Sequence, residues 1–406
     1  MTNKFKIIND PVYGFINIPY EILFDVIEHP YFQRLRRISQ TGLLNLIYPG
    51  ATHTRFHHAL GAMHLMFTAL ETLKLKGVEI SKEEEKSAML AILLHDVGHG
   101  PFSHALENML MHDWHHEKLS LLLMNRLNEE FEGQLSMAIE MFQGKYHRKF
   151  FNQLISSQLD VDRLDYLKRD SFYTGVTEGN VNTQRIISMM NVADEELVID
   201  AKGIYSIENF LTARMFMYWQ VYYHKTSALA ENLLVKILSR AKELVLSGHI
   251  LPASENLNYF LSRQSTGGSV EDIQRFTQLD DNDIIQAMKA WANCEDFLLS
   301  YLCKTIVKRQ FPKTLISSKP FDVDFIREKT NLTNQIFGIS DGHKLVDQIT
   351  LTLLPYSAEQ QPIYLLLKDG TKLALDKSEN QILSSSISQV NTKYILAFPR
   401  ETEAIK

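Results

Sequence analysis

The most constraining feature of this sequence is the segment at residues 94–104, Leu-His-Asp-Val-Gly-His-Gly-Pro-Phe-Ser-His, which follows an apolar stretch with helical spacing. The adjacent His95 and Asp96 at a helix end offer one imidazole and one carboxylate to the same cation. The glycines and the proline then turn the chain sharply, so that His99 and His104 can face one cavity. A His-Asp dipeptide taken alone is weak support for a site, because such pairs often arise by chance and a helix-end histidine is often only structural.

Histidines are concentrated around this segment, since ten of the 15 lie between His53 and His116. Residues 53–61 read His-Thr-Arg-Phe-His-His-Ala-Leu-Gly, and residues 159–166 read Leu-Asp-Val-Asp-Arg-Leu-Asp-Tyr. Together with the His-Asp pair, these segments can supply two imidazoles and two carboxylates from three separated parts of the chain. Such a mixed set of nitrogen and oxygen ligands suits Fe, Mn, Ni or Zn and leaves open positions for water and substrate.

The composition indicates an ordinary globular protein. The 406 residues are 45% hydrophobic and 22% charged, which excludes a disordered, collagen-like or low-complexity chain. Two cysteines cannot build a disulfide framework, and no apolar run approaches the roughly 20 residues of a membrane span. We therefore expect a soluble cytoplasmic protein with no membrane partner. Because the net charge is −6, any phosphate site must be a local cluster of cations.

Apolar periodicity predicts a mainly α-helical fold. Helical patterns cover residues 20–38 with an interruption at Pro30, and then 56–75, 117–127, 150–168, 206–247 and 270–302. Ser81 and Glu84 form a capping-box pattern that opens a further helix, and residues 206–247 are long enough for one long helix or a bent pair. After Pro312 the character changes, and Asp-Gly between two strand-like runs at 363–375 predicts a hairpin. We expect a helical body at residues 1–310 and a small α+β region at 311–406.

Two sets of polar residues share helix faces by their spacing. Asp162, Tyr166 and Asp170 lie at i, i+4 and i+8, and a second stripe at i, i+4, i+8 and i+11 comprises Arg214, Tyr218, Tyr222 and Lys225. The stripe could grip phosphate and contact a sugar, or it could be an amphipathic surface stripe with snorkelling cations. Lys168 and Arg169 are expected on a solvated face.

The order H…HD…D, with the flanks at residues 55–58 and 95–104, resembles the HD-domain metal-dependent phosphohydrolases. More narrowly, it resembles the deoxynucleoside triphosphate triphosphohydrolase branch, the group that contains the animal sterile-alpha-motif and HD-domain enzyme. The similarity extends over roughly the first 230 residues, from Ile8-Asn-Asp-Pro11 to Lys225. It implies an HD-domain helical body and the hydrolysis of dNTPs to deoxynucleoside and inorganic triphosphate.

The resemblance also assigns roles to single residues. It implies one divalent transition metal (Fe, Mn, Ni or Zn), with Mg accompanying the nucleotide, and the metal ligands His58, His95, Asp96 and Asp162. Catalytic roles fall on His99, His104 and His116, with His116 as general acid and Glu107 and Glu117 as its orienting carboxylates. Substrate contacts fall on Gln40, Arg55, Arg163, Tyr166, Asp170, Arg214, Tyr218, Tyr222 and Lys225.

A regulatory site is a further implication of the resemblance. The branch binds an activating nucleotide, dGTP or GTP, between subunits, and the matching positions are Lys6, Ile7, Glu28, Gln33, Arg36, Arg309 and Lys313, with Phe311 between the last two. A homodimer or homotetramer is expected on this interpretation. The plain alternative is a surface helix with ordinary ion pairs.

Two other functions compete with dNTP hydrolysis. An HD phosphohydrolase acting on nucleoside monophosphates or cyclic nucleotides would use the same metal ligands, but the candidate phosphate-binding set is large enough for three phosphates. A non-catalytic nucleotide sensor or single-stranded nucleic-acid binder is disfavoured by the full ligand set and by the acidic net charge, so nucleic acid is not expected as the main partner.

Overall fold

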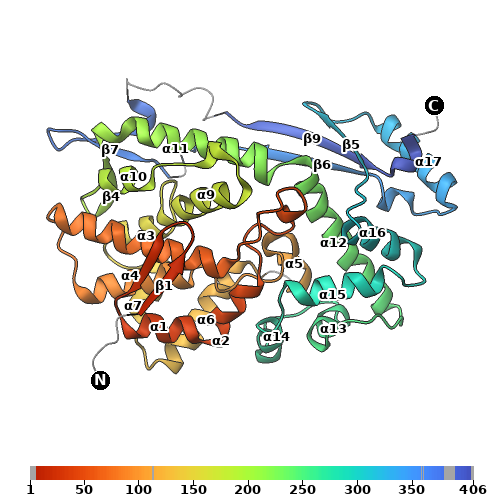
Figure 1. The fold of residues 1–406 in the computed structure, drawn as a ribbon, viewed down its shortest axis with the longest axis horizontal. Helices are drawn as coiled ribbons and strands as arrows, with labels where there is room; N and C mark the ends of the chain where they lie inside the picture. Colours follow the sequence, from red (N-terminus) through yellow and green to blue (C-terminus); the bar gives the residue numbers. More distant parts are fainter. Residues whose placement is uncertain (1–5, 112–113, 358, 360, 379–388, 404–406) are drawn as a thin grey trace.

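The structure is a computed structural model that describes residues 6–111, 114–357, 359, 361–378 and 389–403, and this part of the chain is mainly α-helical, as expected (Figure 1). The helices of the first half are α1 Glu21–Glu28, α2 Pro30–Gln33, α3 Arg55–Leu75, α4 Lys82–Leu94, α5 Glu107–Leu110, α6 His116–Glu130, α7 Ser136–Phe142, α8 Lys149–Ile155 and α9 Val161–Thr174. Those of the second half are α10 Thr183–Met189, α11 Ile204–Met217, α12 Lys225–Leu246, α13 Glu255–Leu261, α14 Val270–Phe276, α15 Asp281–Trp291, α16 Phe297–Val307 and α17 Val323–Phe337.

Short strands form three small sheets on this helical body. The first is an antiparallel hairpin of β1 Lys6–Asp10 and β2 Gly14–Ile18. The second has the order β3-β4-β7-β8, from β3 Met190–Ala193, β4 Glu196–Asp200, β7 Tyr364–Leu366 and β8 Lys372–Ala374. The third has the order β5-β9-β6, from β5 Lys313–Ser317, β9 Asn391–Phe398 and β6 Asp347–Leu353. The antiparallel pair β7–β8 is the hairpin that Asp-Gly predicted.

Capping residues fix the helices that carry the candidate site. The Ser81 hydroxyl accepts a hydrogen bond from the Glu84 backbone N–H at 3.2 Å, and the Glu84 carboxylate accepts one from the Ser81 N–H at 2.8 Å, which confirms the predicted capping box of α4. Asp160 caps α9 by accepting from the Arg163 N–H at 2.7 Å. This cap explains why the predicted helix at 150–168 is two helices, α8 and α9.

Two other long helical predictions resolve into separate helices. The stretch at 270–302 is α14, α15 and the first part of α16, because the side chains of Asp280 and Asp296 cap α15 and α16 and end the preceding segments. The stretch at 206–247 is the bent pair. A π-helix at Tyr218–Tyr222 follows α11, and the chain breaks at His224 before α12 begins.

The C-terminal region is attached to the helical body by shared structure. In Figure 1 the blue strands run along one edge of the body, from α17 at one end to β7 beside β4 at the other. There β7 pairs in parallel with β4, while Phe311, Tyr356 and Leu365 belong to the main buried core. The boundary at residue 311 stays a prediction. Among the described residues, no helix combines the length and apolarity that crossing a bilayer requires.

Candidate active site

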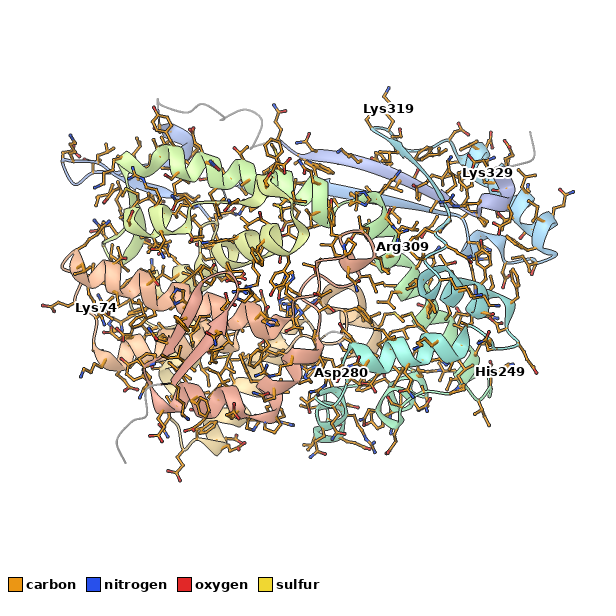
Figure 2. All side chains as sticks on the ribbon, viewed as in Figure 1. Lys74, His249, Asp280, Arg309, Lys319 and Lys329 are labelled. Atoms are coloured by element: carbon orange, nitrogen blue, oxygen red, sulfur yellow. The ribbon has the colours of Figure 1, made fainter. Side chains whose placement is uncertain are left out.

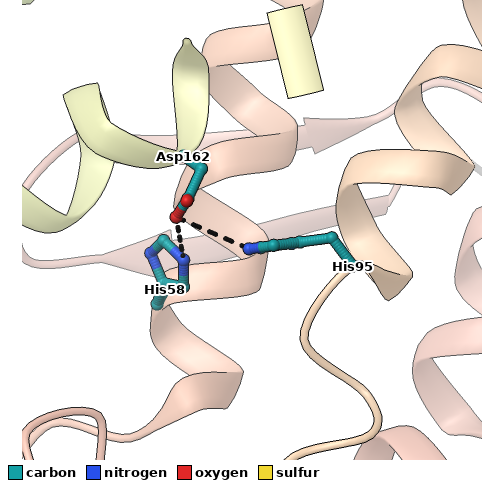
Figure 3. Close-up of side chains that lie close together, drawn as sticks. All are labelled: His58, His95 and Asp162. Carbon is teal, nitrogen blue, oxygen red and sulfur yellow. Dashed lines mark ion pairs between the residues drawn. The ribbon is translucent and has the colours of Figure 1, made fainter. Parts of the chain in front are cut away.

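Three elements that are distant in the sequence bring their polar side chains to one point (Figure 3). His58 comes from the first turn of α3, His95 from the end of α4 and Asp162 from the first turn of α9, and one ligand atom from each lies within 4.8 Å of the others. Asp162 Oδ1 is 3.0 Å from His58 Nε2 and 3.5 Å from His95 Nε2. We call these three residues the HHD cluster.

The histidines of the HHD cluster are oriented through their other ring nitrogens. His58 Nδ1 is 2.7 Å from a carboxylate oxygen of Asp165, and His95 Nδ1 donates to the carbonyl of Ile92 at 2.6 Å. Both Nε2 atoms therefore face Asp162; they are buried, and neither makes a hydrogen bond of good geometry with the described residues. Two buried imidazole nitrogens and a carboxylate oxygen fit a divalent transition metal and give it the second-sphere partners that such histidines usually have.

Asp96 lies at the border of this cluster. Its carboxylate is 3.4 Å from His95 Nε2 and 3.7 Å from His58 Nε2, but it also faces His99 Nε2 at 3.3 Å and accepts a hydrogen bond from Arg55. Burial raises the pKa of Asp96, yet the charge of Arg55 and the neighbouring histidines outweigh burial and hold that pKa well below its usual range. An ionised Asp96 is within reach of a cation held by the cluster.

A buried series of ion pairs lies behind His58 and fixes the orientation of its ring. Asp165 accepts from Arg169 Nε at 2.9 Å, and Arg169 Nη1 donates to Asp10 at 2.7 Å. The expectation that Arg169 lies on a solvated face is wrong, because its side chain is fully buried between these two carboxylates. Gly61 makes the arrangement possible, since a Cβ at this position would overlap Asp165 and Arg169 where α3 and α9 cross.

Hydrogen bonds to its backbone groups hold the loop that follows His95 in place. Arg34 is fully buried and donates to the carbonyls of Val97 at 3.0 Å and His99 at 2.8 Å. The Gly98 N–H donates to Ser120 Oγ at 2.9 Å, and a Cβ on Gly98 would overlap the backbone at the start of α6. The glycine thus allows the loop to touch α6, which brings the His99 and His116 rings into a stack with centroids 4.0 Å apart.

Asp162 of the HHD cluster lines a cavity of about 530 Å³, a size typical of small-molecule sites. Its lining combines cationic or titratable groups with four tyrosines and a few apolar side chains: Gln40, Thr41, Gly42, Leu44, Arg55, Asp96, His99, Phe102, Ser103, His116, Asp162, Arg163, Tyr166, Asp170, Tyr218, Tyr222, Tyr223, Ser227, Ala228, Glu231 and Leu351. The cavity therefore offers one end for anionic groups and aromatic surface beside it.

Comparison with known proteins gives the family. The HD domain model matches residues 55–170, which hold the whole HHD cluster, and the model of an HD associated region matches residues 181–258. The Bacillus subtilis protein YwfO, which is uncharacterized, is 32% identical over 98% of this chain and 92% of its own length. This chain is an HD-domain phosphohydrolase. A solved phosphohydrolase from Bacteroides thetaiotaomicron is 48% identical, with a TM-score of 0.94 over 98% of this chain and 100% of that one.

Other relatives of this HD-domain protein carry a more specific name. A Dictyostelium discoideum deoxynucleoside triphosphate triphosphohydrolase SAMHD1 homolog is 31% identical over 62% of this chain and 53% of its own length. The human deoxynucleoside triphosphate triphosphohydrolase SAMHD1 is 26% identical over 70% of this chain and 50% of its own length. This chain therefore spans about half the length of these two relatives.

The structure brings most of the predicted site residues of the HD domain to the cavity and leaves others away from it. Arg214 is buried, and its guanidinium donates to Gln158 and to the carbonyl of Pro355. Lys225 is exposed at the start of α12. Both residues leave the predicted stripe because the π-helix and the break at His224 interrupt it. Glu117 is exposed on α6 and does not line the cavity. The side chains of His104 and Glu107 lie outside the part of the chain that the structure describes.

Sequence reasoning missed a buried hydrogen-bond network around Asp170. Asp170 lies between His53, whose Nε2 is 2.6 Å from one carboxylate oxygen, and Tyr222, whose hydroxyl donates to the other at 2.6 Å. His53 is fully buried and stacks on Tyr173 with centroids 4.4 Å apart. The network fixes both Asp170 and Tyr222 against the cavity. Only the presence of His53 in the histidine-rich segment signalled it.

His99 in the cavity wall and His58 in the HHD cluster have pKa values shifted in opposite directions. Burial and the charge of Arg55 lower the pKa of His99 well below its usual value, so this imidazole is neutral at pH 7. In the HHD cluster, burial lowers the pKa of His58, but the carboxylates of Asp162 and Asp165 outweigh it and raise that pKa to about 10. A cation that binds His58 Nε2 therefore displaces a proton.

The predicted regulatory residues occupy two places on the surface. Near α1 and α2, the Lys6 ammonium lies over the Phe24 ring at 2.8 Å, and Arg36 donates to Gln33 at 2.8 Å; Ile7 and Glu28 are exposed on β1 and at the end of α1. Arg309, which Figure 2 labels, donates to the carbonyl of Leu46. Lys313 pairs with Glu403. Their role stays a prediction.

Proposed function

We propose that this protein hydrolyses deoxynucleoside triphosphates to deoxynucleosides and inorganic triphosphate. The observation that supports this most is one cavity lined by Asp162 of the HHD cluster, by the cations Arg55 and Arg163, and by the aromatic side chains Tyr166 and Tyr222. A triphosphate needs several cations and a sugar needs a flat surface with hydroxyl partners, and the two requirements meet in this cavity. The names of the Dictyostelium and human relatives point to the same substrate class.

The residues of the chain would divide the work as follows. The HHD cluster with Asp96 would hold one Fe, Mn, Ni or Zn ion, and such an ion supplies Lewis-acid chemistry to a phosphoryl group and to water. Arg55 and Arg163 would neutralise phosphate charge, while Asp170 and Gln40 would bind the sugar. His116, stacked on the neutral His99, would protonate the sugar oxygen as it leaves.

Regulation and assembly are part of the same proposal. An activating dGTP or GTP, with Mg, would bind between subunits of a cytoplasmic homodimer or homotetramer. The exposed position of Glu28 and Arg36 near Lys6, and the separate location of Arg309 and Lys313, suit a nucleotide that contacts two subunits.

A release assay tests the proposal. The purified protein is supplied with Mn and Mg and with each dNTP singly and mixed, and in parallel with nucleoside monophosphates and cyclic nucleotides. We expect triphosphate only from dNTPs, and a loss of at least 100-fold in Asp162→Ala, which removes an oxygen ligand. The control Asp324→Ala, exposed on α17, keeps full activity. Release of orthophosphate from a monophosphate or opening of a cyclic nucleotide, without triphosphate, would replace the proposal by the second function.

A further inference from the structure

Glu231 is a cavity-lining carboxyl group to which the roles above give no task. It lies on α12 with Ser227 and Ala228, which line the same cavity. Among the described residues, no hydrogen bond or ion pair engages this side chain. Burial alone acts on its pKa and raises it to about 7. A carboxyl group kept in a cavity without a protein partner is available to a ligand.

The charges in the cavity decide which part of a nucleotide Glu231 can face. Arg55, Arg163 and the HHD cluster would attract the phosphates, whereas a carboxylate would repel them. Glu231 Oε1 lies 3.7 Å from the point that a Cβ of Gly42 would occupy, so it faces the turn just after Gln40. Glu231 and the turn of residues 40–42 therefore lie on the same side of the cavity.

The surroundings of Glu231 suit a nucleobase. Leu44 and Leu351 supply apolar surface, and Tyr223 supplies a ring that is fixed by the hydrogen bond from its hydroxyl to the carbonyl of Thr352 at 3.2 Å. Ser227 and Ala228 are small and leave room beside them. An apolar pocket with one polar group at a defined point is the usual construction of a specificity site.

We propose that Glu231 recognises the base by accepting hydrogen bonds from its exocyclic amino group, an inference that rests on the proposed function. Adenine and cytosine present such an amino group at C6 and C4, whereas guanine, hypoxanthine, thymine and uracil present a carbonyl oxygen at the corresponding position. The ionised carboxylate accepts from the amino group and repels the carbonyl oxygen, so the selectivity belongs to pH values above 7 and is measured at pH 8. Glu231 thus makes the enzyme favour dATP and dCTP over dITP, dTTP and dUTP.

Competition between matched substrates tests this inference. dCTP against dUTP, and dATP against dITP, differ chiefly in an amino group replaced by an oxygen, and each pair is hydrolysed in one tube with a fixed concentration of GTP. We expect the wild type to favour the amino member by about tenfold in kcat/KM. In Glu231→Gln the preference falls toward unity, because an amide offers both a donor and an acceptor. The control Glu243→Gln, on the same helix but away from the cavity, keeps the preference for the amino member of each pair.

The alternatives give different results. No preference in the wild type overturns the inference without any variant, so the test does not depend on how Glu231→Gln folds. An equal loss of activity on all four substrates in Glu231→Gln would make Glu231 a proton donor or a structural residue instead. If no nucleotide yields triphosphate, the proposed function itself fails, and the base inference fails with it.

Discussion

At the scale of single residues, the HHD cluster depends on partners that do not face the cavity. Asp165 orients His58 from behind and is itself held by Arg169, which reaches Asp10 at the start of the chain. All of these groups are buried, so each charge is compensated only by its neighbours. Removing one partner leaves an uncompensated charge and a freely rotating imidazole.

The substitution Asp165→Asn tests this support. An amide cannot hold both His58 and Arg169 as the carboxylate does, so we expect metal affinity to fall roughly 10- to 100-fold. Titration of the metal-free protein with Mn, followed by calorimetry, measures the affinity, and Asp25→Asn, exposed on α1, is the control. A folded Asp165→Asn protein with unchanged affinity would contradict a positioning role for Asp165.

The raised pKa of Glu231 predicts how the stability of the folded protein changes with pH. Its pKa in the folded protein is about 7, raised by burial from the value of 4.5, so the unfolded chain releases this proton first as the pH rises. The folded state therefore loses up to about 3 kcal/mol relative to the unfolded state between pH 4.5 and pH 7, and the loss remains above pH 7. The substitution Glu231→Gln removes this loss of stability. We expect a higher Tm than wild type at pH 8 and an equal Tm at pH 4.5.

Glu243→Gln serves as a control with the opposite sign. Hydrogen bonds from Lys344 and Arg240 lower the pKa of Glu243 despite some burial, so its ionised form stabilises the folded state above pH 4.5. This variant should be less stable than wild type at pH 8. A Glu231→Gln protein that is no more stable than wild type at pH 8 would show that Glu231 has a normal pKa.

At the scale of elements, the loop after α4 connects the HHD cluster to the cavity wall. Arg34 lies in the 3-10 turn after α2 and donates to the carbonyls of Val97, His99 and Leu279. The Asp281 carboxylate of α15 accepts from the backbone N–H groups of Ser39 and Phe102. These contacts join the first 40 residues to the region around α15 through the loop that carries His99. The loop is thus fixed from both sides.

The substitution Arg34→Met removes three donors from buried carbonyls. We expect a loss of roughly 2–4 kcal/mol in unfolding free energy and a parallel loss of activity, because unsatisfied buried carbonyls are costly. Denaturant unfolding measures the change. Arg37→Met is the matched control. Arg37 is half-exposed, and its partner Asp280 is buried but keeps the hydrogen bond from the Asn282 N–H, so the loss of Arg37 should cost less, about 1 kcal/mol. Equal losses in the two variants would contradict the role given to Arg34.

At the scale of the whole molecule, the C-terminal region is part of the site. Leu351 of β6 lines the cavity, Pro355 accepts from Arg214, and β7 extends the sheet of β3 and β4. Phe311 and Tyr356 lie in the main core. A chain that ends at residue 310 would expose this apolar surface and an unpaired strand edge.

Deletion of residues 311–406 is therefore expected to abolish cooperative unfolding and solubility rather than leave an active helical domain. Expression of residues 1–310 beside the full chain, followed by circular dichroism during heating, measures this. A soluble truncated protein with a sharp transition and triphosphate release would show that the C-terminal region is an independent addition.

The sequence predicted what depends on local patterns. Periodicity and a capping box predicted α3 and α4, Asp-Gly predicted the β7–β8 hairpin, and the resemblance to the HD-domain family implied which histidines would meet. It did not predict the burial of Arg169, because its partner Asp10 is 159 residues away. It also could not predict the π-helix that moves Lys225 out of the stripe, since that change of phase depends on packing around Tyr218–Tyr222.

The measurement that tests the central claim most directly is phosphorus NMR of the products formed from a dNTP mixture with Mn. This account predicts that inorganic triphosphate is the phosphorus-containing product, formed in equal amount to deoxynucleoside, and that it is absent with Asp162→Ala. Pyrophosphate with a nucleoside monophosphate, or orthophosphate with a diphosphate, would show cleavage at another bond and would contradict the account.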